Sequence, residues 1–234
     1  MDYRVCLIDC DPQANMTMAL GYEQPDELPV TIHTLIAEII NGGLKTEKKD
    51  FMLHKQNIDF VPSNIELSAI ENILLNSISR ENILKKLLNK IKEDYDFIII
   101  DTMPSLNFIT INAMNAANSI LIPMQSQYFS AKGLELLMTT IANVKENLNP
   151  NLEIDGILMT MYDNRLNFHK EIIEILSENY GKHLKIFNTK IPITIKVTEM
   201  QARSQSVFDN DPTSKISESY EKFAYELVNG DIVG

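Results

Sequence analysis

The chain has 234 residues, of which 44% are hydrophobic and 23% charged, and this composition excludes a disordered or fibrous protein. Its 32 acidic and 21 basic side chains give a net charge of −11, which excludes a protein that coats nucleic acid by bulk charge. No apolar run approaches the ~20 residues of a membrane span, and the two cysteines, Cys6 and Cys10, lie too close together for a disulfide framework. We therefore expect a cytoplasmic protein with no membrane partner.

Strand-like apolar runs alternate with helical patterns along the whole chain. This alternation predicts an α/β fold with a doubly wound, mainly parallel sheet, in a single domain over residues 1–234. The segment 63–66 has the pattern of a capping box that opens a helix. Strands are predicted at 5–8, 58–61, 97–100, 120–122, 157–159 and 184–187, and helices around 32–40, 83–91, 134–141, 168–176 and 216–227.

Two of these strands end in carboxylates. Asp9 and Asp11 follow the first strand, and Asp101 follows the strand at 97–100. Ligands of an open parallel sheet bind beyond the carboxyl ends of its strands, so the three side chains are expected at one sheet edge. Their mutual repulsion favours a Mg²⁺ ion held through waters and a phosphate. For either segment alone, an Asp that merely starts a turn or caps a helix is the favoured interpretation. The two segments together, with the additional Asp11, favour the metal site instead.

The two aspartate segments carry a resemblance to a known family. The run Leu7–Thr17, with Asp-x-Asp-Pro-Gln, and the run Tyr95–Leu106, with Asp-Thr-x-Pro-Ser, resemble nucleotide motifs of the ParA/Soj partition ATPases, deviant-Walker relatives of MinD. The resemblance spans nearly the whole chain in the family's order. Further matching segments are 61–64, 110–113, 121–128, 161–165, 191–192 and 220–224.

The resemblance implies a three-layer α/β/α fold like that of P-loop NTPases, with ATP and Mg²⁺ as ligands. By resemblance, Asp9 and Asp101 would hold the metal and its waters, and Asp11 would orient the water that attacks the γ-phosphate. Asp163 and Pro192 match family positions beside the adenine base, although Asp163 is also a natural turn residue and Pro192 a natural end of a strand, which are the stronger interpretations.

The family's phosphate loop, Lys-Gly-Gly-x-Gly-Lys-Thr, has no counterpart in the printed sequence, which starts at the strand that follows it. The segment Asn41–Thr46 echoes that loop but follows a helical stretch, so we interpret it as a glycine C-cap and a charged loop. Without the loop's amides and lysines, we expect neither tight ATP binding nor hydrolysis. We also expect exposed apolar sheet surface that leads to self-association, a rearranged sheet or poor solubility.

Complete family members bind non-specific DNA as ATP-dependent dimers and are cycled by a ParB-type partner. By resemblance, Lys196 and Lys215 would contact DNA, weakly because lysine lacks the bidentate geometry of arginine. Either one is as readily a solvated surface lysine.

Three classes of function follow from these patterns. The first is a chromosome or plasmid partition protein, or its sporulation-regulating form, with a homodimer as its expected assembly. The second is a non-enzymatic module that binds a partner or itself. The third is an unrelated enzyme that uses Asp11 and Asp101 on another metal–phosphate substrate, although no Gly-x-Gly-x-x-Gly loop supports it.

Overall fold

The computed structural model describes residues 2–126, 131–182, 184–194, 197, 200 and 204–230. The chain forms two compact units whose segments alternate along the sequence. The first comprises Met1–Ala117 with Thr140–Asn151, and the second Asn118–Thr139 with Leu152–Gly234. None of the helices that the structure describes combines the length and the apolarity needed to cross a membrane.

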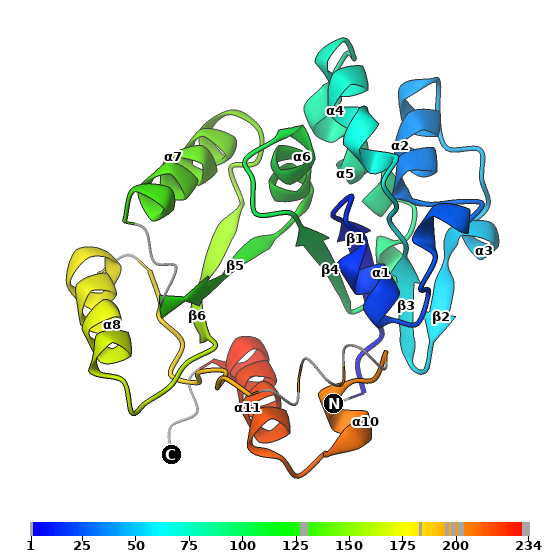
Figure 1. Cartoon of the computed structure of the whole chain (residues 1–234). Helices are drawn as coiled ribbons and strands as arrows, with labels where there is room; N and C mark the ends of the chain where they lie inside the picture. The colour runs from blue at the N-terminus through cyan, green and yellow to red at the C-terminus, as the bar shows by residue number, and fades with distance from the viewer. Residues whose placement is uncertain are drawn as a thin grey trace. The chain divides into compact units, whose positions relative to one another are not determined.

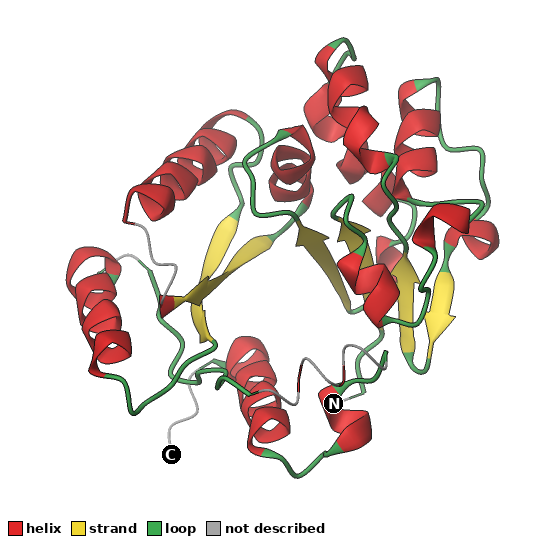
Figure 2. Cartoon of the chain, in the orientation of Figure 1, coloured by secondary structure: helices red, strands yellow, loops and turns green. Residues whose placement is uncertain are grey.

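A four-stranded sheet organises the first unit, and Figure 2 shows its strands as neighbouring arrows. Strands β1 (Val5–Cys10), β3 (Ile58–Val61) and β4 (Phe97–Thr102) run parallel, and β2 (Leu53–Lys55) adds an antiparallel edge, in the order β2-β3-β1-β4. The predicted α/β fold with a mainly parallel sheet is confirmed. The strand predicted at 58–61 is confirmed with its bounds, and those at 5–8 and 97–100 each extend two residues further.

Along β1, every second side chain points to the same face of the sheet, and this face packs into the core. Cys6, Ile8 and Cys10 of β1 are fully buried and pack with apolar side chains of the helices that Figure 1 shows above the sheet. These helices are α2 (Ile32–Ile40), α4 (Leu67–Leu75), α5 (Ile83–Leu88) and α6 (Phe108–Ala116); the unit also contains α1 (Asn15–Ala19), α3 (Lys48–Phe51) and the 3₁₀ turns η1 (Pro25–Glu27), η2 (Arg80–Asn82) and η3 (Lys92–Asp94).

The predicted capping box at 63–66 is wrong. Helix α4 begins only at Leu67, and its N-cap residue, Glu66, makes no side-chain cap. Ser63 lies too far upstream to cap the helix, and its amide instead donates to the hydroxyl of Thr17 at 3.0 Å.

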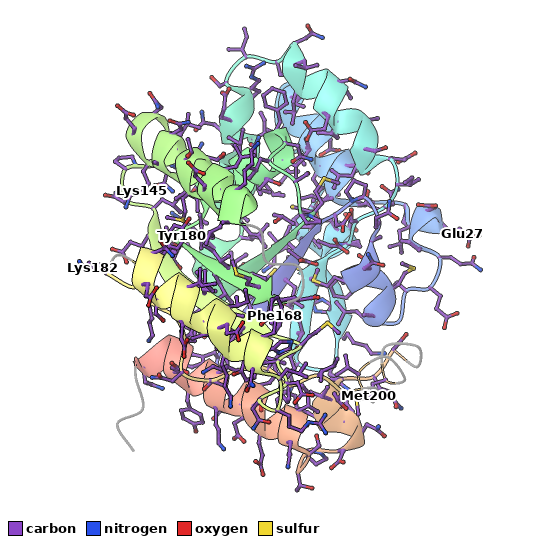
Figure 3. The ribbon with its side chains drawn as sticks, turned by 60° about the vertical axis from the view of Figure 1, so that its left-hand side comes forward. Glu27, Lys145, Phe168, Tyr180, Lys182 and Met200 are labelled. Atoms are coloured by element: carbon purple, nitrogen blue, oxygen red, sulfur yellow. The ribbon has the colours of Figure 1, made fainter. Side chains whose placement is uncertain are left out.

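In the second unit, β5 (Ser119–Gln125) and β6 (Glu153–Thr160) pair in parallel. The register shifts between Ile120 and Leu121, beside Gly156, whose φ is +144°. A side chain at Gly156 would come within 2.6 Å of the Lys185 carbonyl, so only glycine fits there. The helices are α7 (Ala131–Asn147), which runs from this unit into the first, α8 (Asn167–Tyr180), α10 (Val207–Asn210) and α11 (Lys215–Asn229). Figure 3 labels Phe168 and Tyr180 at opposite ends of α8.

The strand predicted at 184–187 is wrong. Of this segment only Ile186 pairs, in an isolated parallel bridge with Ile157 of β6. The next two amides, those of Asn188 and Thr189, donate to the buried carboxylate of Glu226 at 2.7 and 2.9 Å, so they are not available to extend a ladder.

Candidate functional site

Asp9 and Asp101 lie side by side at one edge of the four-stranded sheet. They are register partners in the parallel pair of β1 and β4, which places their backbones about 4.8 Å apart. Because both belong to the same alternation set as Leu7 and Ile99, their side chains lie on the sheet face opposite the Cys6–Ile8–Cys10 face. The predicted juxtaposition of the two carboxylates is confirmed.

The Asp9 carboxylate is fully buried and holds the following loop in place. Its Oδ2 accepts hydrogen bonds from the amide and the hydroxyl of Thr17 at 2.9 and 2.7 Å, and its Oδ1 accepts from the amide of Asp11 at 3.1 Å. The chain can turn back toward Asp9 because Ala14 adopts a left-handed conformation with φ of 52°. Asp9 is therefore covered by the loop that follows it and fixes both ends of the segment that carries Asp11.

Asp11 and Asp101 are the more accessible carboxylates. Asp11 is half-buried and accepts a hydrogen bond from the amide of Gln13 at 2.9 Å, whereas Asp101 is exposed. Both side chains are therefore accessible to solvent, whereas the Asp9 side chain is not. Waters or a ligand can therefore approach two of the three predicted site carboxylates.

The electrostatics of the site disfavour three negative charges. Desolvation raises the pKa of Asp9, an effect that the hydrogen bonds from Thr17 and Asp11 oppose. The pKa of Asp101 is also raised, first by desolvation and then by the charges of Asp9 and Asp11. A cation placed at this edge would relieve the repulsion and return both pKa values toward their ordinary range.

The donor set suits a magnesium ion held through its waters. Across the described ranges, no three His, Cys, Asp or Glu side chains come together closely enough to enclose a metal directly. Mg²⁺ keeps several waters and is usually bound through one or two carboxylates and substrate phosphates. Asp101 and Asp11 supply carboxylates of that kind, so the residues present fit this ion.

The glycine segment at Asn41–Thr46 is a loop that binds its own carboxylate. Gly42 and Gly43 follow α2 with φ values of +119° and +126°. The amides of Lys45 and Thr46 donate to Oε2 of Glu38 at 2.8 and 2.9 Å, and the Thr46 hydroxyl donates to Oε1 at 2.8 Å. These donors would face a phosphate in a phosphate loop, but here they are occupied by Glu38. The interpretation as a glycine C-cap and charged loop is confirmed.

Asp163 and Pro192 lie on neighbouring segments of the second unit. Tyr162 and Pro192 form a parallel bridge, next to which the amide of Tyr162 donates to the carbonyl of Ile191 at 2.9 Å. Both oxygens of Asp163 bind the guanidinium of Arg165, which lowers the pKa of Asp163 to about 2. An adenine amino group would have to compete with Arg165 for this carboxylate.

Only one of the two lysines predicted to contact DNA lies among the residues that the structure describes. Lys196 lies outside the described residues. Lys215 is the first residue of α11 and is exposed, while the preceding Ser214 caps the helix by accepting from the amide of Ser217. Lys215 is thus accessible to a phosphate backbone.

Sequence reasoning missed two residues that organise these segments, Thr17 and Glu38. Thr17 is fully buried and bridges Asp9 to the amide of Ser63. Its place at the end of the run Leu7–Thr17 was visible in the sequence, but the direction of its hydroxyl depends on the left-handed turn at Ala14.

Comparisons with known proteins identify the family. The family described as "AAA domain" matches residues 1–154. The chain is 37% identical to the chromosome-partitioning ATPase Soj of Treponema pallidum over 230 residues, which cover 97% of this chain and 86% of that protein. It is 36% identical to the sporulation initiation inhibitor protein Soj of Bacillus subtilis over 226 residues, 96% of this chain and 86% of that protein.

The solved structures agree with the fold. A cobyrinic acid a,c-diamide synthase from Mycobacterium smegmatis, solved with an ATP analogue and magnesium, superposes with a TM-score of 0.82 at 28% identity, covering 98% of this chain and 85% of that one. Its sequence identity is lower than that of the Soj proteins. The aspartate motifs, the parallel sheet and the near-complete match to Soj proteins point the same way, and the chain belongs to the ParA/Soj family of partitioning ATPases.

Proposed function

We propose that this protein acts in chromosome or plasmid partition and binds Mg²⁺ and ATP at the edge of its first sheet where Asp9 and Asp101 lie. The observation that carries the proposal is the pairing of Asp9 with Asp101 in adjacent parallel strands, with Asp11 on the next loop. It is supported by the Soj relatives, which match nearly the whole chain, and by the Mycobacterium structure, whose occupants were an ATP analogue and magnesium.

Each carboxylate has a distinct task in this proposal. Exposed Asp101 would hold a Mg²⁺ ion through its waters, and Asp11 would orient the water that attacks the γ-phosphate. Asp9 holds the Asp11 loop through Thr17 and the Asp11 amide, and it would add negative charge to the metal site. The metal, when bound, neutralises charge on the phosphates.

Phosphate binding also requires cations and amide donors, because three carboxylates by themselves repel a triphosphate. The glycine loop after α2 does not supply them, since Glu38 occupies its amides. We therefore propose that tight Mg–ATP binding depends on a family-type phosphate loop joined to this chain. In the partition role, Lys196 and Lys215 would contact DNA and a ParB-type protein would be the partner.

The test is calorimetry with Mg–ATP and a phosphate-release assay on two versions of the protein. One version is the 234-residue chain, and the other carries an added N-terminal segment with Lys-Gly-Gly-x-Gly-Lys-Thr. Only the extended version is expected to bind and turn over ATP. In that version Asp11→Asn should lower turnover by about 100-fold or more while binding persists, because only the orientation of water is lost.

Asp50→Asn, an exposed site on α3, is the matched control and should leave turnover unchanged. Micromolar binding and turnover by the printed chain would contradict the need for the loop. An extended version that neither binds nor hydrolyses ATP would contradict the ATPase proposal and favour the non-enzymatic binding module.

A further inference from the structure

Two buried ionisable side chains hold the segments that contain Asp163 and Pro192. Glu226 of α11 is 2% exposed, and His169 of α8 is 3% exposed. Both belong to the second unit, as do β6 and the two segments that they contact. Neither side chain has a task in the chemistry proposed for the aspartates of the first unit, so their hydrogen bonds indicate a different role.

The Glu226 carboxylate binds two successive amides of the segment that leads to Pro192. Its Oε1 accepts from the amide of Asn188 at 2.7 Å, and its Oε2 accepts from the amide of Thr189 at 2.9 Å. Burial acts to raise the pKa of Glu226, but the hydrogen bonds from Thr189 and Asn188 outweigh it, so the pKa lies below its ordinary value. The ionised carboxylate therefore fixes the backbone of this segment from α11.

His169 fixes the other segment from α8. Its Nδ1 accepts a hydrogen bond from the amide of Asp163 at 2.9 Å, so this ring nitrogen carries no proton. The ring of His169 also packs against the ring of Tyr162, with centroids 5.4 Å apart. The backbone of Asp163 thus depends on a buried acceptor just as that of Asn188 and Thr189 does.

The two segments lie side by side just beyond the carboxyl end of β6. The amide of Tyr162 donates to the carbonyl of Ile191 at 2.9 Å, and the amide of Ile193 donates to the carbonyl of Tyr162 at 3.2 Å. The amide of Ile191 donates to the carbonyl of Met159 in β6 at 2.9 Å. Ligands of parallel sheets bind beyond the carboxyl ends of the strands, and these segments occupy such a place in the second unit.

Helix α11, which carries Glu226, is itself packed on β6. Its Ile216 and Phe223 belong to one buried cluster with Leu158 of β6, together with Phe187 and Ile191. The rings of Phe187 and Phe223 meet edge to face, with centroids 5.1 Å apart. Because this apolar contact sets the position of the helix, the Glu226 carboxylate holds the amides of the neighbouring segment at a defined place.

The side chains on the two segments suit a planar heterocycle. Tyr162 and Pro192 are partners in the parallel bridge, and bridge partners carry their side chains on the same face. Both are half-buried, so part of each ring is accessible. Ring surfaces of this kind stack with nucleoside bases. The next residue, Asp163, adds an acceptor that an exocyclic amine would share with Arg165.

We infer that Glu226 and His169 are positioning residues for a purine base that binds against Tyr162, Asp163 and Pro192. Both are buried, so they act through the backbone that they hold and not by touching the base. The choice of adenine as the base rests on the proposed ATP role. Adenosine carries no phosphates and needs no phosphate loop, so the 234-residue chain itself can be tested.

The test is a titration of the ¹⁵N-labelled 234-residue chain with adenosine, followed by the NMR signals of its backbone amides. Saturable shifts are expected in the segments 161–163 and 191–194, with a Kd of about 1 mM or below, and ribose should cause none. Glu226→Gln turns an amide group toward a backbone donor, and His169→Leu removes the acceptor of the Asp163 amide. Each should weaken adenosine binding by at least about fivefold.

Controls separate positioning from general loss of stability. Circular dichroism at the titration temperature establishes that each variant is folded. If Glu226→Gln does not fold, Thr189→Val removes only a hydroxyl that binds Glu226 and should still weaken adenosine binding by at least about threefold. Glu221→Gln on α11 and Lys170→Leu on α8 change exposed side chains of the same helices and should leave the affinity unchanged.

The outcomes distinguish this role from the ATPase proposal. An affinity that stays within about twofold in a folded Glu226→Gln or His169→Leu variant, even with a lower Tm, overturns the inference for that residue. Absence of adenosine binding by the wild type overturns it for both. Adenosine binding that depends on Glu226 and His169 supports the inference even if the version with the added phosphate loop fails to bind Mg–ATP, a failure that contradicts only the proposed function.

Discussion

Thr17 joins three segments of the first unit through one hydroxyl group. It donates to the buried Asp9 carboxylate at 2.7 Å and accepts from the Ser63 amide at 3.0 Å, and it is itself fully buried. A buried carboxylate is costly unless donors compensate for its lost water. Thr17 supplies two of the three hydrogen bonds that do so at Asp9.

Replacing Thr17 with valine is expected to lower the free energy of unfolding by about 3 kcal/mol, because a buried carboxylate and a buried amide each lose a partner. Thr17→Ser keeps the hydroxyl and should cost about 1 kcal/mol for the lost methyl group. Urea titration of both variants measures the difference.

The pH dependence of Thr17→Val identifies Asp9 as the cause. The Thr17 hydrogen bonds lower an Asp9 pKa that burial raises, so the variant should raise it further. A folded-state pKa above the unfolded value means that the folded state binds the proton more tightly than the unfolded state does. The stability that Thr17→Val loses relative to the wild type should therefore be largest near pH 7 and should shrink as the pH falls. A deficit that stays constant with pH would contradict this account.

At the scale of single residues, the sequence predicted which carboxylates meet but not which one is buried. Asp9 and Asp101 could be placed together because parallel strands bring their carboxyl ends to one edge. The burial of Asp9 and the exposure of Asp101 depend on what covers each strand, and α1 reaches Asp9 only through the left-handed turn at Ala14. A non-glycine residue with positive φ has no clear signature in sequence.

Among the elements, the loop after α2 depends on Glu38 of that helix. Its carboxylate accepts from the amides of Lys45 and Thr46 and from the Thr46 hydroxyl. These hydrogen bonds lower the pKa of Glu38, with the Thr46 amide as the largest cause. The ionised carboxylate therefore stabilises the loop and the end of α2 together.

Glu38→Ala should lower the free energy of unfolding at pH 7 by about 1–2 kcal/mol, since three donors must turn to water. Glu38→Gln keeps one acceptor oxygen and should cost less. Because the folded-state pKa lies below the ordinary value of 4.5, the wild-type advantage should be present above that pH and disappear as the pH falls below it.

Chemical denaturation at several pH values measures this difference, with the exposed Glu93→Ala of η3 as the control. An advantage that persists unchanged well below pH 4.5 would show that the ionised carboxylate is not responsible.

Helices and strands were predicted correctly where apolar residues recur at regular spacing. They were missed where tertiary contacts, and not the sequence pattern, determine the secondary structure. The helix at 32–40 is confirmed with its bounds because its apolar residues recur on one face. Helix α6 was not predicted, since it buries Asn112 and Asn115 together with apolar residues and shows no polar face. Strand β2 was also missed, because Leu53–Lys55 is short and contains two polar residues.

For the whole molecule, charge and exposed apolar surface set the requirements for assembly. Recognition of the family from the paired aspartate motifs is confirmed by the Soj relatives, since such motifs span many positions in a fixed order. The oligomeric state is not encoded in such motifs. It depends on surfaces such as the end strand β4, which pairs only with β1 in the part of the chain that the structure describes.

Among the described residues, β4 pairs along one edge only, and it also carries an apolar face. Phe97 is 39% exposed and Ile99 is 54% exposed, and both lie on the sheet face that carries Asp101. Unpaired edge strands with exposed apolar side chains recruit further strands or surfaces, and charged residues on such strands prevent this. We therefore expect the printed chain to self-associate at high concentration, and Ile99→Lys to weaken that association by at least about tenfold.

Sedimentation velocity over a range of concentrations measures the effect. Ile175→Lys, at a site 41% exposed on α8, adds the same charge at an isoleucine away from β4 and should leave the association unchanged. Because the net charge of −11 opposes association, added salt should strengthen it in the wild type by screening this repulsion. A wild-type chain that sediments as a monomer at every concentration and salt level would show that the exposed face of β4 does not drive assembly.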